Sequence, residues 1–210
     1  MPKLGMQQIR RRQLIDATIR TIEAYGFADT TIARISQAAG LSSGIISHYF
    51  GGKNALLAAT MRSLLTDLQG EMITRLRRAR SPEARVEAVI GASFANEQFT
   101  PQVTAAWLAF YGQVPHAPEL ARLHRVYVRR LRSNLCHAFR QILPPTRAEQ
   151  AAEGMSSMID GIYVRAALER RRRTPDMAQA RALADDYLRM LLRNHAGERR
   201  GRDSGHAGAG

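Results

Sequence analysis

The chain has 210 residues, of which 45% are apolar and 23% are charged, and these proportions exclude disorder along its whole length. Lysine and arginine outnumber aspartate and glutamate by 31 to 18, and the resulting net charge of +13 indicates a polyanionic partner. Lys3 and Lys53 are the only lysines, so 29 of these cations are arginine, which suits bidentate contact with phosphate or base edges. A generally basic surface without a specific partner is the alternative interpretation.

The cellular compartment follows from three features. A single cysteine, Cys136, excludes an internal disulfide and is typical of a reducing environment. The longest apolar run, VTAAWLAFYG from Val103, is too short to span a bilayer, and the first residues lack the apolar segment of a signal peptide. The sequence therefore predicts a cytoplasmic protein with no membrane partner.

The first 80 residues are predicted to be helical with short turns, because no proline lies between Pro2 and Pro82. An apolar face at helical spacing predicts a first helix that ends at Gly26. Thr30 or Thr31 is expected to cap a second helix and Ser42 a third, with a long fourth helix following from about residue 52 to residue 81.

Five further helices are predicted from proline and glycine breaks, at about 82–98, 101–114, 118–142, 146–172 and 176–194. No segment shows sustained alternation of apolar and polar residues, so the sequence predicts an all-α fold. The polar, glycine-rich end, residues 195–210, is predicted to be disordered.

The second and third helices, joined by a glycine turn at Gly40, match the helix-turn-helix pattern, in which the later helix enters the major groove. Ser42, Ser43 and Gly44 at its start are small, which allows base edges or phosphates to come close. Ile46 and Phe50, four residues apart, are expected to anchor its inner face. Lys53 begins the next helix, where the helix dipole disfavours a cation, and a phosphate partner explains its placement. A compact helical hairpin with an incidental basic residue is the alternative.

The segment TTIARISQAAGLSSGIISHYFGGKNAL resembles the DNA-binding domain of the TetR family of one-component repressors. Both contain a Thr-capped helix, an Ala-Gly-Leu-Ser turn, a glycine, an aromatic-Phe pair and a lysine after a two-residue turn. The resemblance implies that Thr31, Tyr49 and Lys53 hold phosphates. It further implies that base edges are read or approached by Ser43, Gly44, Ile45, Ser47 and His48, with Ser42 in the turn. Most members have tyrosine where this chain has Ser47, so one usual contact is absent.

Within the family, GIISHYF is similar to the BetI-type branch, repressors of glycine betaine synthesis from choline. Agreement extends over roughly residues 1–192, through WLAF near Trp107, ARLHRVYVRRLRSNLCHAFRQILP and IDGIYVRAAL. The resemblance implies a DNA-binding domain at 8–68 with its motif at 31–50, and a ligand-binding and dimerisation domain at 69–194. It also implies that choline releases the repressor from genes for choline uptake and oxidation to betaine.

Eight of the 13 aromatic residues lie between residues 94 and 163, and Trp107, Phe110 and Tyr111 share one helix face. Such faces hold quaternary ammonium ions, and a nearby carboxylate adds to the attraction. The predicted ligand-binding residues are Phe94, Glu97, Trp107, Phe110, Tyr111, Tyr127, Asp160 and Tyr163. Core packing is the alternative for the rings, and Asp160 is equally able to pair with Arg165 or a backbone donor.

Apolar stripes at 146–172 and 176–194 predict half of a four-helix interface in a homodimer, or else internal packing. A dimer is favoured because a single short motif reads few base pairs, and it implies a two-fold symmetric operator in double-stranded DNA. The six histidines have no metal-ligand spacing and no nucleotide-binding or hydrolase motif occurs, so no cofactor, metal or enzymatic activity is predicted. Two alternatives remain, a repressor sensing another cationic or amphipathic compound and a basic nucleoid protein that senses nothing.

Overall fold

A computed structural model describes residues 3–169 and 176–206, with side chains for 6–169 and 176–196. Every regular element in these ranges is helical, which confirms the predicted all-α class. The helices are α1 (Lys3–Tyr25), α2 (Ile32–Ala39), α3 (Gly44–Phe50), α4 (Lys53–Arg78), α5 (Pro82–Ser93), α6 (Pro101–Gln113), a 3₁₀ turn η1 (Val114–His116), α7 (Pro118–Phe139), α8 (Pro145–Glu169) and α9 (Met177–His206).

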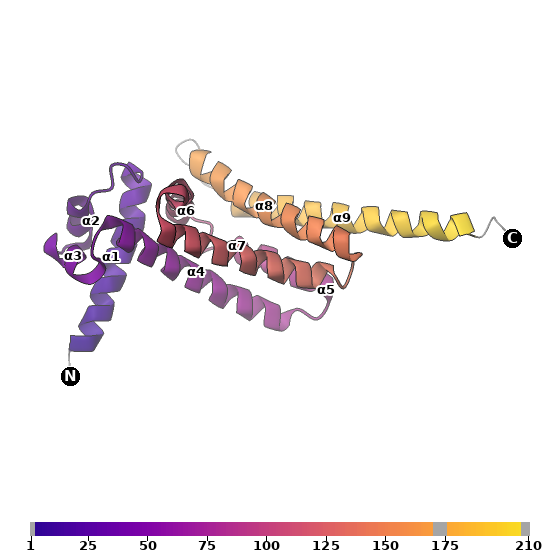
Figure 1. The fold of residues 1–210 in the computed structure, drawn as a ribbon, viewed down its shortest axis with the longest axis horizontal. Helices are drawn as coiled ribbons and strands as arrows, with labels where there is room; N and C mark the ends of the chain where they lie inside the picture. Colours follow the sequence, from indigo (N-terminus) through magenta and orange to yellow (C-terminus); the bar gives the residue numbers. More distant parts are fainter. Residues whose placement is uncertain (1–2, 170–175, 207–210) are drawn as a thin grey trace.

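The helices α1, α2 and α3 and the first turns of α4 form a small domain at one end of the molecule, here called the reader (Figure 1). The Thr31 side chain caps α2 by accepting the Arg34 N–H, and Gly40 ends that helix in the left-handed region at φ 65°. The reader has its own small core, formed by Leu14, Ala17, Ile35, Ile46 and Leu56.

The remaining helices, with the rest of α4, form a second domain, here called the sensor, whose long helices run along the long axis of the molecule (Figure 1). α4 continues unbroken past residue 68, where the sequence places the domain boundary, so one helix belongs to both domains. Ile22 of α1 and Leu57 of α4 are buried in the same core cluster as the sensor residues. The sensor core therefore extends into the reader, beside the separate small core of the reader.

Several helix boundaries differ from the sequence prediction, and those of α5 and α3 are the most informative. α5 ends at Ser93 and not near residue 98, because Phe94 and Phe99 both turn inward against the ring of Tyr163. The hydroxyl of Tyr163 lies within hydrogen-bonding distance of the Ser93 and Gln98 carbonyls, which the end of the helix leaves without partners. The N-cap of α3 is Ser43 and not Ser42, and the Ser43 side chain makes no capping hydrogen bond.

The predicted disordered tail is also partly wrong, because α9 continues through His206. No proline follows residue 175, so the backbone hydrogen-bond ladder of α9 extends beyond the last apolar residues. Residues 207–210 lie outside the described residues, as do positions 170–172 of the predicted eighth helix. Among the described helices, none combines the length and the apolar character needed to cross a membrane.

Substitution of Gly40 tests whether the turn between α2 and α3 requires a left-handed backbone conformation. Gly40 has a positive φ that an L-residue adopts at a cost of roughly 1–2 kcal/mol, so Gly40→Ala is expected to lower the free energy of unfolding by about that amount. Gly70 lies exposed inside α4 with no atom near the position of an added Cβ, so Gly70→Ala is expected to raise it by about 0.5–1 kcal/mol. Urea unfolding of both variants measures these opposite signs, and equal effects would contradict the assignment of the turn.

Candidate functional site

The outward face of α3 presents a row of small polar groups on a rigid support. Ile46 is completely buried and fixes the helix to α1, α2 and α4 through the reader core. Ser43, Gly44, Ser47 and His48 are exposed. The helix is therefore held by one face, while the other is free to meet a flat or grooved partner.

Residues beside this exposed row take part in the packing of the reader. Ile45, Tyr49 and Phe50 are half-buried and pack against the reader core, which agrees with the predicted anchoring role of Phe50. Ile45 therefore presents only part of its side chain to a partner. Ser42 is exposed in the turn, and Thr31 is exposed at the start of α2, where its oxygen accepts the Arg34 N–H.

Arg11 of α1 braces the recognition helix, a role that sequence reasoning missed. Its guanidinium lies 4.4 Å from the centre of the Phe50 ring and donates a 2.8 Å hydrogen bond to the Tyr49 carbonyl. That carbonyl is at the end of α3, where intrahelical donors run out. No local pattern marks Arg11 for this role, because the contact joins residues 38 positions apart.

Lys53 lies at the joint between the two domains. Its ammonium donates a 2.7 Å hydrogen bond to the Phe27 carbonyl and lies 4.1 Å from the centre of the Phe27 ring. Burial lowers the pKa of Lys53, and the charge of Asp29 acts in the opposite direction. An ammonium carries three N–H donors, so the bond to Phe27 leaves donors for a second acceptor.

The sensor gathers most of the predicted ligand residues around one carboxylate. Tyr111 of α6 and Tyr127 of α7 each donate a 2.9 Å hydrogen bond to Oδ1 of Asp160 on α8. The Trp107 ring lies beside them, with its centre 4.7 Å from that of Tyr127 and 5.5 Å from that of Tyr111. These four residues, here called the aromatic–carboxylate cluster, join three helices.

The charge of Asp160 is incompletely compensated. Among the described residues, no lysine or arginine lies within ion-pair distance of it, so the pairing with Arg165 considered from the sequence is not formed. Burial raises the pKa of Asp160, although the two tyrosine hydroxyls and His124 favour the ionised form. Burial and the same carboxylate also raise the pKa of Tyr111 and of Tyr127, so both hydroxyls stay protonated as donors.

Three other predicted residues lie around this cluster in supporting positions. Tyr163 contacts Trp107 edge to face at 5.9 Å and stacks on Phe94 at 6.0 Å. Phe110 is fully buried, with its centre 5.8 Å from that of Trp107. Glu97, by contrast, is exposed in the turn after α5, and among the described contacts none joins it to the cluster. The inward turn of Phe94 and Phe99 leaves Glu97 on the outer side.

His124 is a neighbour of the cluster that sequence reasoning missed. Its ring centre lies 5.8 Å from that of Tyr111 and 6.1 Å from that of Phe110. A signal was available, because His124 precedes Tyr127 by three residues and therefore shares its helix face.

The rings of the cluster are in direct contact. A cation that binds an aromatic face lies within about 6 Å of the ring centre, and a sandwiched cation needs a wider separation than the 4.7 Å between Trp107 and Tyr127. The arrangement combines π faces with an incompletely compensated negative charge, the two features that attract a small organic cation, but in the observed packing the rings contact one another. Across the described part of the chain, no group of His, Cys, Asp and Glu side chains is placed to hold a metal ion.

The fold and the exposed face of α3 define a helix-turn-helix transcription regulator with a larger helical C-terminal domain. A family model for bacterial regulatory proteins of the tetR family matches residues 14–60, and a model for the C-terminal domain of BetI-type transcriptional repressors matches residues 82–193. The chain therefore belongs to the TetR family, with a C-terminal domain of the BetI type, and is a DNA-binding transcriptional repressor rather than an enzyme. Regulators of this family bind operator DNA and act as dimers.

Relatives of known name agree with this assignment. The chain is 51% identical over 195 residues to the HTH-type transcriptional regulator BetI 1 of Chromohalobacter salexigens, covering 91% of this chain and 95% of that protein. It is 50% identical to the HTH-type transcriptional regulator BetI of Burkholderia mallei, covering 91% of this chain and 98% of that protein.

Solved structures share the fold at lower identity. A transcriptional regulator from Rhodococcus aligns with a TM-score of 0.75 and 20% identity over 88% of this chain and 96% of that one. A regulator from Saccharomonospora viridis, solved in complex with choline, aligns with a TM-score of 0.72 and 16% identity over 85% of this chain and 95% of that one.

Because the pKa of Asp160 is raised, a variant without this charge is expected to be more stable than the wild type, by an amount that depends on pH. Burial disfavours the ionised carboxylate, so Asp160→Asn, which keeps the acceptor oxygen, is expected to raise the unfolding midpoint at pH values above the raised pKa. Between the raised folded pKa and the ordinary value of 3.8, the folded wild type binds more protons than the unfolded chain. The wild type therefore gains stability relative to the variant as pH falls.

Thermal unfolding of both proteins between neutral pH and pH ~4, at one protein concentration, measures this difference. The advantage of the variant is expected to shrink steadily toward the acid end. An advantage that grows on acidification would show that the hydrogen bonds outweigh the burial of the charge.

Proposed function

We propose that this protein represses genes for choline uptake and for conversion of choline to glycine betaine, and that choline releases it from their operator. The single observation that carries the ligand assignment is Asp160, a carboxylate without a cation partner among the described residues, held beside Trp107 by two tyrosine hydroxyls. Choline combines a quaternary ammonium group, which suits the rings and the charge, with a hydroxyl. The proposal places the protein in the cytoplasm, where both the operator and the incoming choline are found.

The names of the relatives and one neighbour of the same fold support this choice of ligand. The two relatives at about half identity over nearly their whole length carry the BetI name. The Saccharomonospora viridis regulator, which resembles this chain in fold, was crystallised with choline. A larger cationic or amphipathic compound is the competing ligand, and it requires a wider separation of the same rings.

Release from DNA follows in this proposal from the two faces of α6. One face carries Trp107 and Tyr111, and the other carries Ala105, Leu108 and Ala109, which line a cavity of about 510 Å³ together with Phe27 and Lys53 at the joint. When the rings separate around choline, α6 moves. Helix α1 of the reader packs against α6 and therefore moves with it. A preference of about 1–3 kcal/mol for this arrangement is enough to weaken operator binding.

The proposed DNA contacts are divided between base edges and phosphates. Ser43, Gly44, Ser47 and His48 are exposed on α3 and are assigned to the major groove, together with the accessible part of Ile45. The phosphates are assigned to Thr31 before α2, to Ser42 and Tyr49 near the two ends of α3, and to Lys53 at the start of α4. The dimer partner is assigned to the exposed apolar face of α8 and α9, which carries Leu168 and Leu183.

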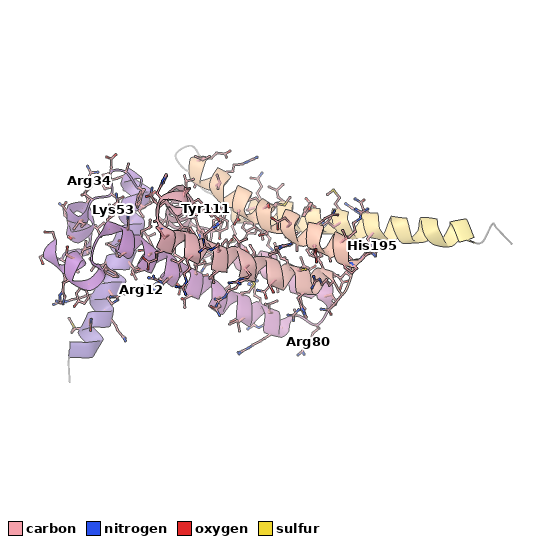
Figure 2. The ribbon with its side chains drawn as sticks, viewed as in Figure 1. Arg12, Arg34, Lys53, Arg80, Tyr111 and His195 are labelled. Carbon is pink, nitrogen blue, oxygen red and sulfur yellow. The ribbon has the colours of Figure 1, made fainter. Side chains whose placement is uncertain are left out.

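The phosphate role of Lys53 is tested by its salt dependence. Lys53→Ala is expected to weaken binding to operator and random DNA by the same factor and to lower the slope of log affinity against log salt by about 1. Arg80→Ala is the matched control, because Figure 2 places Arg80 at the opposite end of α4 from Lys53. A loss confined to the operator would show that Lys53 acts through the shape of the reader, by way of Phe27.

Trp107 is the only tryptophan in the chain, so its fluorescence reports directly on the cluster. Choline is expected to change its emission and, in a gel shift at fixed physiological salt with random competitor, to release DNA from upstream of the protein's own gene. Asp160→Asn is expected to weaken choline binding at least about tenfold, since a partly buried charge attraction exceeds ~1.4 kcal/mol. Glu97→Gln, the matched loss of a carboxylate outside the cluster, is expected to leave it unchanged.

An uncharged isostere of choline, 3,3-dimethylbutan-1-ol, separates charge recognition from shape. Binding equal to that of choline would show that the cluster is an apolar pocket. Choline could change the Trp107 fluorescence and yet leave operator binding unchanged. That result would support the ligand site but contradict a role for choline binding in release from DNA.

A further inference from the structure

The outer face of α7 carries a positively charged groove that neither the reader nor the aromatic–carboxylate cluster uses. Arg125, Arg129, Arg132 and Arg140 follow one another at spacings of four, three and eight residues, which places them on one side of the helix. They border a groove of about 1080 Å³, here called the α7 groove. Its other lining residues are His124, Val128, Ser133, Cys136, His137, Gln141 and Glu149.

The net charge of this groove is positive. Arg132 pairs with Glu153 at 3.2 Å and Arg140 pairs with Glu149 at 2.7 Å, but all four side chains are about half exposed or more. Solvent-exposed pairs of this kind are screened and exchange readily for other anions. Arg125 and Arg129 are exposed and form no ion pair with any residue that the structure describes.

The position of the groove separates it from the operator. α3 lies at one end of the molecule, whereas α7 runs away from the reader along the long axis (Figure 1). The opposite, buried face of α7 carries Tyr127, Leu131 and Leu135 in the core. Residues 81–210 hold 19 cations and 13 acids, so about half of the chain's positive excess lies in or beyond the sensor.

We propose that the α7 groove binds the phosphate backbone of a second DNA segment while the readers occupy the operator. From Arg125 to Arg140 the row extends about 22 Å at a helical rise of about 1.5 Å per residue, and one DNA strand carries a phosphate about every 3.4 Å of its axis. An extended polyanion therefore meets several arginines at once, which a small anion cannot do. Guanidinium groups are well matched to phosphate oxygens.

A membrane surface fits the same groove less well. Val128 is the only aliphatic side chain of its lining and is half-buried, so the groove offers no exposed apolar group for insertion between lipids. A row on one helix is also narrower than a flat lipid surface. A dimer has two such grooves. While bound to its operator it can therefore hold a second duplex through the phosphates alone and so connect two DNA segments.

Cys136 makes the groove directly observable. It is the only cysteine of the chain and lies half-buried in the groove, one helical turn from both Arg132 and Arg140. A duplex lying on the arginines covers it, so the rate of its alkylation by a neutral reagent such as N-ethylmaleimide reports occupancy. DNA held by the distant reader leaves this rate unchanged.

The experiment uses full-length dimer bound through its readers to excess bead-immobilised DNA from its own promoter region. A labelled random-sequence duplex is then added, and both its capture and the alkylation of Cys136 are measured without choline. The wild type is expected to capture the second duplex and to show Cys136 alkylation slowed several-fold by it. The double variant Arg125→Gln/Arg129→Gln is expected to lose both effects, while the equally charged change Arg77→Gln/Arg78→Gln, at the exposed far end of α4, retains them.

Each other outcome overturns the proposal. Capture that survives in Arg125→Gln/Arg129→Gln, or capture without protection of Cys136, places the second duplex elsewhere. Dissociation of this variant into monomers in sedimentation assigns the arginines to the dimer interface. Protection of Cys136 by vesicles of phosphatidylcholine and phosphatidylserine, with none by DNA, assigns the groove to a lipid surface.

Discussion

The structure depends on the larger of its two cores, which contains residues of both the reader and the sensor. Ile22 near the end of α1 and Leu57 near the start of α4 are buried together with the aromatic residues of α6. Close-packed interiors deform little, so a change at the sensor rings is not absorbed locally. The bond from Lys53 to the Phe27 carbonyl adds a polar contact at the same joint. Residues of α1 and α4, the two helices that carry the reader, therefore pack in the same core as the aromatic residues of α6.

Beside this core, Asp160 is a costly residue whose placement the proposed function explains. A partly buried carboxylate without a cation lowers stability, and two tyrosine donors compensate for only part of the loss of water. An apolar residue in its place would give a simpler core but would not supply the charge that the proposed cationic effector requires. Proteins commonly retain such local conflicts at binding sites, where stability and activity compete.

Much of the fold was predictable because helix signals are local. Periodic apolar residues, the Thr31 cap and the glycine at position 40 define the reader helices within a few residues of their observed ends. Two of the features that were missed involve long-range contacts. The early end of α5 depends on Tyr163, 70 residues later, and the support of α3 by Arg11 spans 38 residues. Helical spacing predicted that Trp107 and Tyr111 lie on one face. Spacing alone did not show which carboxylate, Glu97 or Asp160, lies beside them.

The recognition helix is bounded by backbone features rather than by its exposed side chains. Gly40 precedes it, and Gly51 and Gly52 follow it, all three with positive φ. Ile46 supplies its anchor, while Ser43, Ser47 and His48 add nothing to the core. Mutations at these three positions are therefore expected to change the free energy of unfolding little. If they read the operator as proposed, a duplicated copy of such a gene is free to acquire new target promoters while its folding remains intact.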